Sequence, residues 1–312
     1  MPRTPTKRRV TLRDVAEASG VSQSTVSFVL NEVPSQTISE ATSERVRTAA
    51  RDLGYVPHGI ARALMEGSSR IVVLNIERNR EGNYSRTFIH GLDKELALHG
   101  FALLVRHGHP SKSDAEQIAN VIAPKAVLQF GEAYLTGHEL EDSGGGWKNG
   151  MAAHVLLQFR YLSERGHARI ALALPEGEPL AAVRERFARE VAEMLELPEI
   201  DVIVLPRDFS KVAAELASFR ERRPEVTAIA GFSDFTALQV LGGMRQLGLS
   251  APADWAVIGF DESEYAEMFT PGLTTLTADA EGHGRLAARQ ALGLDARDVK
   301  IKIGRVITRE SA

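Results

Sequence analysis

A short run of polar side chains near the N-terminus has the chemistry needed to recognise base edges. Gln23, Ser24 and Thr25 follow one another, and Phe28 comes one helical turn later. Glutamine can form two hydrogen bonds with adenine, serine and threonine can donate or accept, and phenylalanine can pack on the thymine methyl group. Arginines on neighbouring elements can hold phosphates. These residue types predict a surface that binds duplex DNA.

Two short helices are predicted to position this run. Thr11 and Asp14 form a capping-box-like start, and Gly20 ends the first helix. Ser22 can cap the second helix. The apolar stripe of the second helix consists of Val26, Val29 and Leu30. Two helices joined by a glycine-containing turn form a helix-turn-helix, whose second helix enters the major groove.

A third helix is predicted from Ser39, a good N-cap, to Leu53, with Gly54 just beyond its end. The residues expected to face inward are Ala41, Val46, Ala49, Ala50 and Leu53. The residues expected on its exposed side are Arg45, Arg47 and Arg51. Spacing alone leaves a second interpretation open, in which the segment is a small helical bundle with a solvated polar face.

The charge is unevenly distributed along the chain. The whole chain has 37 Lys and Arg against 41 Asp and Glu, a net charge of −4. Residues 1–70 carry ten basic against seven acidic residues, or +3, whereas the remainder carries 27 against 34, or −7. The two parts are therefore predicted to meet different partners.

The residue identities of the N-terminal segment add a family resemblance. Residues 10–31 (VTLRDVAEASGVSQSTVSFVLN), 42–46 (TSERV) and 53–58 (LGYVPH) closely resemble the LacI/GalR family of bacterial transcriptional regulators. The resemblance implies a hinge helix over residues 57–65, with Leu64 as a wedge in the minor groove; interdomain packing is the alternative role for Leu64. Phe28 stands where many relatives have Arg, so a different half-site is expected. The DNA contacts implied are Thr11, Leu12, Ser22, Gln23, Ser24, Thr25, Ser27, Phe28, Asn31, His58, Ala61 and Leu64.

From residue 70 onward, short β-branched segments alternate with helical ones, which is typical of parallel βαβ units. The predicted strands are 71–76, 101–105, 126–130, 170–174, 202–205, 228–231 and 256–259. The predicted helices are 87–100, 115–122, 151–165, 183–195, 212–222 and 235–247. The expected fold is α/β: a helix-turn-helix headpiece (1–56), a hinge and linker (57–69), and a two-lobed periplasmic-binding-protein-like core (70–312). One lobe is expected to combine about 70–135 with 279–298, and the other about 150–275 with 299–312.

The family resemblance extends into this core and implies an effector site in the cleft between the lobes. The residues implied are Arg186, Ser233, Asp234 and Asp261. An arginine and a carboxylate suit polyols or anionic ligands, and the alternative is an ordinary solvated pair. Several positions depart from the family: Ser233 replaces an asparagine, Arg189-Glu190 replaces Gly-Phe, and Ala280 replaces an aromatic residue. A ligand-binding aspartate expected between residues 130 and 151 cannot be located.

Other classes of function have weaker support. The chain has no cysteine, which excludes disulfides, thiolate metal sites and cysteine nucleophiles. No apolar run reaches the length of a membrane helix and the start lacks a signal peptide, so we expect a soluble cytoplasmic protein without a membrane partner. His107 and His109 lack an acidic partner nearby, so no metal site is predicted. Neither a cofactor nor an enzymatic activity is expected.

These observations predict a homodimeric, sequence-specific DNA-binding regulator, a repressor that recognises a palindromic operator. A small effector such as a sugar is expected to modulate it. One alternative keeps the DNA binding but makes the core a degenerate dimerisation scaffold without a ligand. Another is a solute-binding protein, against which the attached helix-turn-helix counts strongly.

Overall fold

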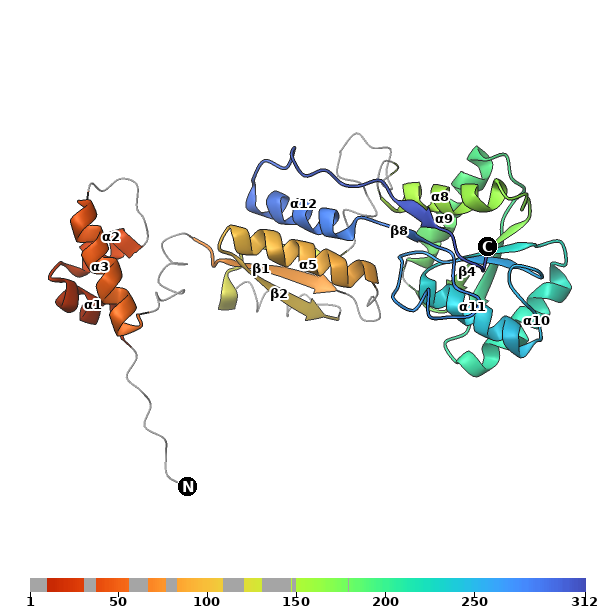
Figure 1. Cartoon of the computed structure of the whole chain (residues 1–312), viewed down its shortest axis with the longest axis horizontal. Helices are drawn as coiled ribbons and strands as arrows, with labels where there is room; N and C mark the ends of the chain where they lie inside the picture. The colour runs from red at the N-terminus through yellow and green to blue at the C-terminus, as the bar shows by residue number, and fades with distance from the viewer. Residues whose placement is uncertain are drawn as a thin grey trace, which may run out of the picture. The chain divides into compact units, whose positions relative to one another are not determined.

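The chain folds into two compact units. The computed structural model describes residues 10–30, 38–55, 67–76, 83–108, 121–130, 147, 150–178 and 180–312. One unit extends to Arg70 and includes Val121–Ala123, and the other comprises the rest of the chain from Ile71 (Figure 1). Each unit has its own hydrophobic core.

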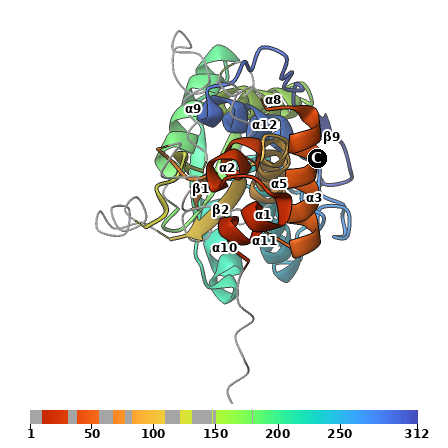
Figure 2. The same ribbon diagram turned by 90° about the vertical axis from the view of Figure 1, so that its left-hand side faces the viewer.

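The N-terminal unit contains three helices, α1 (Leu12–Ser19), α2 (Gln23–Leu30) and α3 (Glu40–Leu53), which pack against one another (Figure 2). Helix α1 ends at Gly20 and α3 at Gly54, both in the left-handed conformation that glycine adopts without steric cost. The buried core of the unit consists of Val15, Ala16, Val26, Val29, Val46 and Ala50. The predicted helix-turn-helix and its third helix are therefore confirmed.

Two positions on α3 were assigned to the wrong face. Ala41 and Leu53 were expected to face inward, but both are exposed, and Leu53 retains 39% of its accessible surface. The inward face of this short helix is set by Val46 and Ala50, which lie four residues apart. Ala41 and Leu53 lie near the two ends of the helix and line a solvent-open groove beside α1, so neither is buried.

The first lobe of the second unit is a three-stranded parallel sheet of order β2-β1-β3. Its strands are β1 (Ile71–Ile76), β2 (Ala102–His107) and β3 (Ala126–Gln129). Two helices, α5 (Asn83–Leu98) and α12 (Ala280–Leu292), pack against each other in this lobe although they are far apart in sequence (Figure 1). Glycine permits this close approach, because a Cβ atom on Gly284 would lie 2.1 Å from the carbonyl oxygen of Phe88.

The second lobe is a four-stranded parallel sheet of order β5-β4-β6-β7. Its strands are β4 (Ile170–Pro175), β5 (Asp201–Leu205), β6 (Ala228–Gly231) and β7 (Ala256–Ile258). Its helices are α8 (Met151–Ser163), α9 (Ala181–Met194), η1 (Phe209–Lys211), α10 (Val212–Arg222) and α11 (Asp234–Gln246). One buried cluster packs α8 and α9 against the sheet, and a second packs α10 and α11 against it. The sheet is therefore a buried central layer, as expected for parallel strands.

The predicted α/β class with parallel βαβ units is confirmed. A short antiparallel pair, β8 (Thr275–Thr277) with β9 (Arg305–Ile307), was not predicted. Most of the predicted helix 115–122 and of the glycine-rich stretch between Phe130 and Met151 lies outside the described residues. Within the part of the chain that the structure describes, no helix combines the length and the apolar character needed to cross a membrane.

Candidate nucleic-acid interface and interlobe site

The first turn of α2 presents polar side chains to solvent. The hydroxyl group of Ser22 caps the helix, because its Oγ accepts a hydrogen bond from the backbone N–H of Thr25 at 3.1 Å. Gln23 and Ser24 follow directly and are both exposed. Val26 and Val29, on the opposite side of α2, are buried in the core of the unit. The same helix therefore anchors itself with one face and presents hydrogen-bonding groups with the other.

The remaining described DNA-contact candidates also have structural roles. Thr11 caps α1: its backbone N–H and its hydroxyl group donate to Asp14 at 2.7 Å each. Leu12 is partly buried and packs against the core of the N-terminal unit. Ser27 and Phe28 are half-buried. The four other candidates, Asn31, His58, Ala61 and Leu64, lie outside the described residues.

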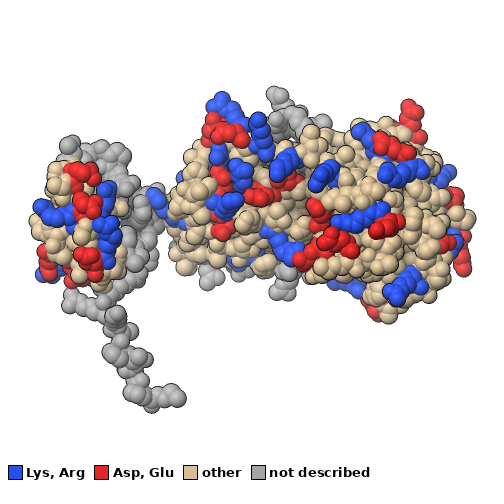
Figure 3. Space-filling view, viewed as in Figure 1, with Lys and Arg blue, Asp and Glu red and all other residues tan. Residues whose placement is uncertain are grey.

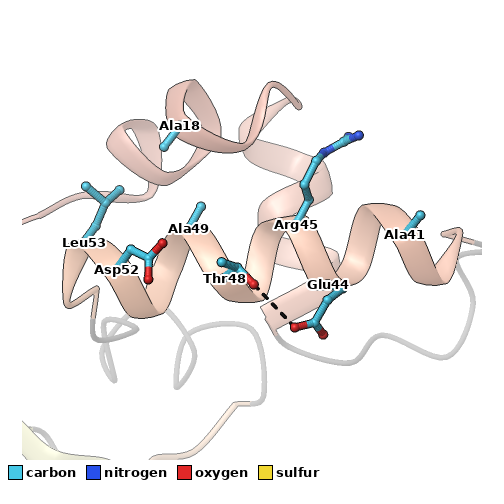
Figure 4. Close-up of a pocket in the computed structure, with 8 residues that line it drawn as sticks. All are labelled: Ala18, Ala41, Glu44, Arg45, Thr48, Ala49, Asp52 and Leu53. Atoms are coloured by element: carbon cyan, nitrogen blue, oxygen red, sulfur yellow. Dashed lines mark hydrogen bonds between the residues drawn. The ribbon is translucent and has the colours of Figure 1, made fainter.

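The exposed arginines of α3 differ in their pairing. Arg51 donates to Glu44 at 3.0 Å, and Arg47 lies 3.8 Å from Glu40. Arg45 is exposed and forms no ion pair among the described residues. It borders a shallow groove between α1 and α3, shown in Figure 4. The groove is lined by Ala18, Ala41, Glu44, Arg45, Thr48, Ala49, Asp52 and Leu53.

Acidic and basic side chains are interspersed on the visible face of both units (Figure 3). Arg189, which was noted as a departure from the family, pairs with Glu185 and Glu199 at 2.7 Å each. The other departure in that dipeptide, Glu190, lies 3.7 Å from Arg186. These residues of α9 therefore form a solvated ion-pair surface.

In the second unit, Asp234 is a buried carboxylate at the start of α11. Its oxygens accept hydrogen bonds from the backbone N–H of Phe260 at 2.7 Å and of Ser263 at 2.5 Å, and from the hydroxyl group of Thr275. Burial is the largest influence on this carboxyl group and raises its pKa, although the three hydrogen bonds act in the opposite direction. Ser233 caps α11 by accepting a hydrogen bond from the N–H of Thr236 at 3.2 Å. The Asp234 carboxylate therefore holds the loop after β7 against α11, whereas Ser233 caps the start of that helix.

Asp261 lies on the loop after β7, beside Asp234 of α11. Its Oδ1 accepts a hydrogen bond from the N–H of Asp234 at 3.4 Å. Burial, together with the neighbouring Asp234 carboxylate, raises the pKa of Asp261 to about 8. Its φ angle is +118°, a region that residues other than glycine rarely adopt. The structure thus brings the two predicted carboxylates together in a strained loop, and such strain is common at binding sites.

The loop also joins the two lobes. The side-chain amide of Asn83, at the start of α5 in the first lobe, donates to the backbone carbonyl oxygens of Asp261 at 3.1 Å and Glu262 at 2.7 Å. Arg86 of α5 lies 3.2 Å from Glu264. The carboxylate pair therefore lies where the first lobe meets the carboxyl end of β7, the edge of a parallel sheet at which ligands usually bind.

The structure does not bring Arg186 to this loop. Its side chain is 60% exposed, and its guanidinium group lies over the ring of Phe187. Arg184, two residues earlier on α9, is fully buried and its charge acts on Asp261. Residues two apart on a helix point about 200° apart, so only one of the two arginines can face the loop. Arg184 was missed, although it shares an apolar face with Phe187, Ala188 and Val191.

Arg184 is held by groups from two other elements. Its guanidinium group lies 3.5 Å from the centre of the Phe260 ring and donates to Oε1 of Gln158 at 2.7 Å. The amide nitrogen of Gln158, on α8, donates in turn to the carbonyl oxygens of Gly231 at 3.0 Å and Gly259 at 2.9 Å. The chain's own side chains therefore cover the carboxyl ends of β6 and β7.

Comparison with known proteins matches two different family models to the two units and finds relatives that span both units. Residues 11–58 match the model described as bacterial regulatory proteins, lacI family, and residues 159–312 match a periplasmic binding protein-like domain. The HTH-type transcriptional repressor PurR of Vibrio parahaemolyticus is 29% identical over 303 residues, covering 85% of this chain and 86% of the relative. The HTH-type transcriptional regulator CelR of Thermobifida fusca is also 29% identical, over 322 residues and 91% of both chains.

Solved structures show the same fold. A lac repressor dimer bound to operator and the anti-inducer ONPF matches with a TM-score of 0.70 at 18% identity, covering 97% of this chain and 99% of that one. A CelR–cellobiose complex matches with a TM-score of 0.59 at 23% identity, covering 97% of this chain and all of the other.

Proposed function

Because this chain belongs to the lacI family of bacterial regulatory proteins, we propose that it acts as a repressor whose first turn of α2 reads the bases of a palindromic operator. It is a sequence-specific DNA-binding transcriptional regulator and not an enzyme. The observation that supports the proposal best is the exposed, Ser22-capped first turn of α2, with Gln23 and Ser24 free of the core. Because operator DNA lies in the bacterial cytoplasm, we expect the protein to act there.

Recognition is divided among three groups of residues. Gln23, Ser24 and Thr25 contact base edges, while Phe28 packs on a thymine methyl group. Arg45, which has no ion-pair partner among the described residues, is available to a phosphate. Leu64, with the hinge residues His58 and Ala61, kinks the central step of the operator. A dimer places two copies of this surface on the two half-sites.

Substitutions in α2 and in the hinge test this division. Gln23→Ala should weaken binding to an operator selected from random DNA by about 1–3 kcal/mol, the discrimination carried by one good bidentate contact. Thr48→Ala, also exposed but on α3, is the matched control and should leave affinity unchanged.

Leu64→Ala should reduce binding to the operator more than to unrelated DNA. Equal loss on both DNAs would remove the wedge from the proposal.

The interlobe site is proposed to take the effector. Arg184 and Asp261, with Ser233 and Asp234 behind them, replace the Arg186–Asp261 pair expected from sequence. Among the relatives, the CelR structure is a complex with cellobiose. A sugar or a related polyol is therefore the first class of ligand to test by calorimetry, with Arg184→Met as the variant that should lose binding.

One observation favours the second candidate function, a regulator with a degenerate core. Arg184 and Gln158 cover the carboxyl ends of β6 and β7 with the chain's own side chains. A ligand has to displace this network before it can reach Asp234. If calorimetry detects no heat of binding for any member of a panel of sugars and nucleosides, while operator binding is intact, this second function is favoured over the effector-regulated one.

A further inference from the structure

Arg184 is a cation held in a fully buried site of the second lobe. Its guanidinium group lies over the ring of Phe260, 3.5 Å from the ring centre, and donates to Oε1 of Gln158 at 2.7 Å. An aromatic face and an amide oxygen are surroundings that suit a planar, weakly hydrated guanidinium group. Because a buried cation is costly unless other groups compensate it, these contacts form a site with the chemistry of guanidinium binding.

The site lies at the edge of the sheet where parallel α/β folds bind their ligands. The amide nitrogen of Gln158 donates to the carbonyl oxygens of Gly231, at the end of β6, and Gly259, just after β7. The two carboxylates that were predicted to contact an effector, Asp234 and Asp261, lie at the same edge. The guanidinium group therefore occupies the place expected for a ligand from solution, although it belongs to the chain.

The loop after β7 connects this site to the first lobe. Phe260, which contacts the guanidinium group, is followed by Asp261 and Glu262, whose φ angles are +118° and +49°. Residues other than glycine rarely adopt such angles, so the loop needs support from its surroundings. From the first lobe, the side-chain amide of Asn83 donates to the carbonyl oxygens of these two strained residues at 3.1 and 2.7 Å. The loop is therefore held from two sides, by the guanidinium group in the second lobe and by Asn83 in the first.

We propose that the second lobe contains a guanidinium-binding site and that Arg184 is its built-in ligand, which holds the loop after β7 in the conformation that Asn83 binds. In an effector-regulated protein, a molecule from solution supplies the binding energy that favours one arrangement of the lobes. Here the chain supplies that energy itself, so the lobes stay joined without a small molecule. The inference rests on the second candidate function, a regulator whose core takes no effector.

The substitution Arg184→Ala empties the site and lets free guanidinium enter it. The probe is guanidinium chloride at about 1–20 mM, far below the molar concentrations that unfold proteins. Sodium chloride at the same concentration controls for ionic strength. Urea, which is planar and of similar size but uncharged, controls for general effects on solvation.

The absence of cysteine makes the distance between the lobes directly measurable. Leu98→Cys on α5 and Glu221→Cys on α10 provide two exposed labelling sites, one in each lobe, for single-molecule energy transfer in the full-length protein. An excess of unlabelled protein ensures that each dimer carries at most one labelled subunit. Far-ultraviolet circular dichroism verifies that each variant is folded.

The wild-type protein should be closed, and guanidinium should leave its interlobe distance unchanged because its site is already filled. Arg184→Ala should shift the population to open molecules. If guanidinium binds only the closed state, ten times its dissociation constant should lower the ratio of open to closed molecules about tenfold. Asn83→Ala should open the lobes without responding to guanidinium, because it removes the contact on the other side of the loop. Arg186→Ala, on the exposed side of the same helix, is the matched control and should remain closed.

The proposal is overturned if Arg184→Ala is as closed as the wild type, if guanidinium does not close it again, or if urea or sodium chloride closes it equally well. If Arg184→Ala does not fold, Arg184→Met decides, because it preserves most of the side-chain volume: open lobes support the proposal and closed lobes overturn it. Operator binding by the wild-type protein is measured separately. Its loss would refute the proposed function, whereas failed closure by guanidinium with operator binding intact refutes only the guanidinium site.

Discussion

Two arginines on one helix should differ sharply in their contribution to stability. Arg184→Ala leaves Oε1 of Gln158 without its charged donor, at a cost of about 1–3 kcal/mol, and removes the cation over Phe260, worth about 2 kcal/mol in a buried site. We therefore expect the free energy of unfolding to fall by about 3–5 kcal/mol, the range seen when a buried charged partner is removed. Arg186→Ala breaks an exposed pair with Glu190 and removes a solvated cation from the ring of Phe187, so it should cost only about 1 kcal/mol.

Urea denaturation followed by circular dichroism and tryptophan fluorescence measures both variants. The two substitutions are of the same type on the same helix, so the change in helix propensity cancels when they are compared. The difference between them therefore reports burial and contacts alone. If the two variants unfold within about 0.5 kcal/mol of each other, or if Arg186→Ala is the more destabilising, the placement of Arg184 at the interlobe site is wrong.

Three further changes test other parts of the structure. Gly284→Ala should lower the melting temperature of the core, because the new Cβ atom would clash with the backbone carbonyl of Phe88 on α5. Gly242→Ala should be tolerated, because the new Cβ atom would meet only the ring of Phe209, which can move. Calorimetry compares the two variants. Thr11→Ala should cost the first helix about 1 kcal/mol of stability, seen as faster amide hydrogen exchange in α1, with Thr48→Ala as the unaffected control. Asp261→Asn should raise the melting temperature at pH 7–8 but not at pH 4. Folding raises the pKa of the Asp261 carboxyl group from 3.8 to about 8, so this group destabilises the folded state as the pH rises above 3.8. Equal effects of the substitution at both pH values would contradict this prediction.

The N-terminal unit could be predicted from sequence because its signals are local. The capping box at Thr11, the left-handed glycines and the spacing of Val26 and Val29 act within one or two helical turns. The two misassigned positions on α3, Ala41 and Leu53, line an open groove beside α1, and helix periodicity alone does not show how closely a neighbouring helix approaches.

The interlobe site was less predictable because it depends on contacts between distant segments. The carboxylates Asp234 and Asp261 could be nominated from family resemblance, but their mutual contact depends on a loop with positive φ angles. Arg184 occupies a position on the apolar face of α9, and a charged residue there is usually assumed to be solvated. Its partners, Gln158 and Phe260, are 26 and 76 residues away in the chain, so no local pattern links them.

The central claim, that the first turn of α2 reads a palindromic operator, is tested most directly by selecting bound sequences from random duplex DNA. The wild-type protein should enrich one near-palindromic sequence, and Gln23→Ala should lose its preference at one pair of symmetry-related positions while keeping the others. Enrichment of no sequence, of a sequence without two-fold symmetry, or of the same sequence by both proteins would contradict the claim.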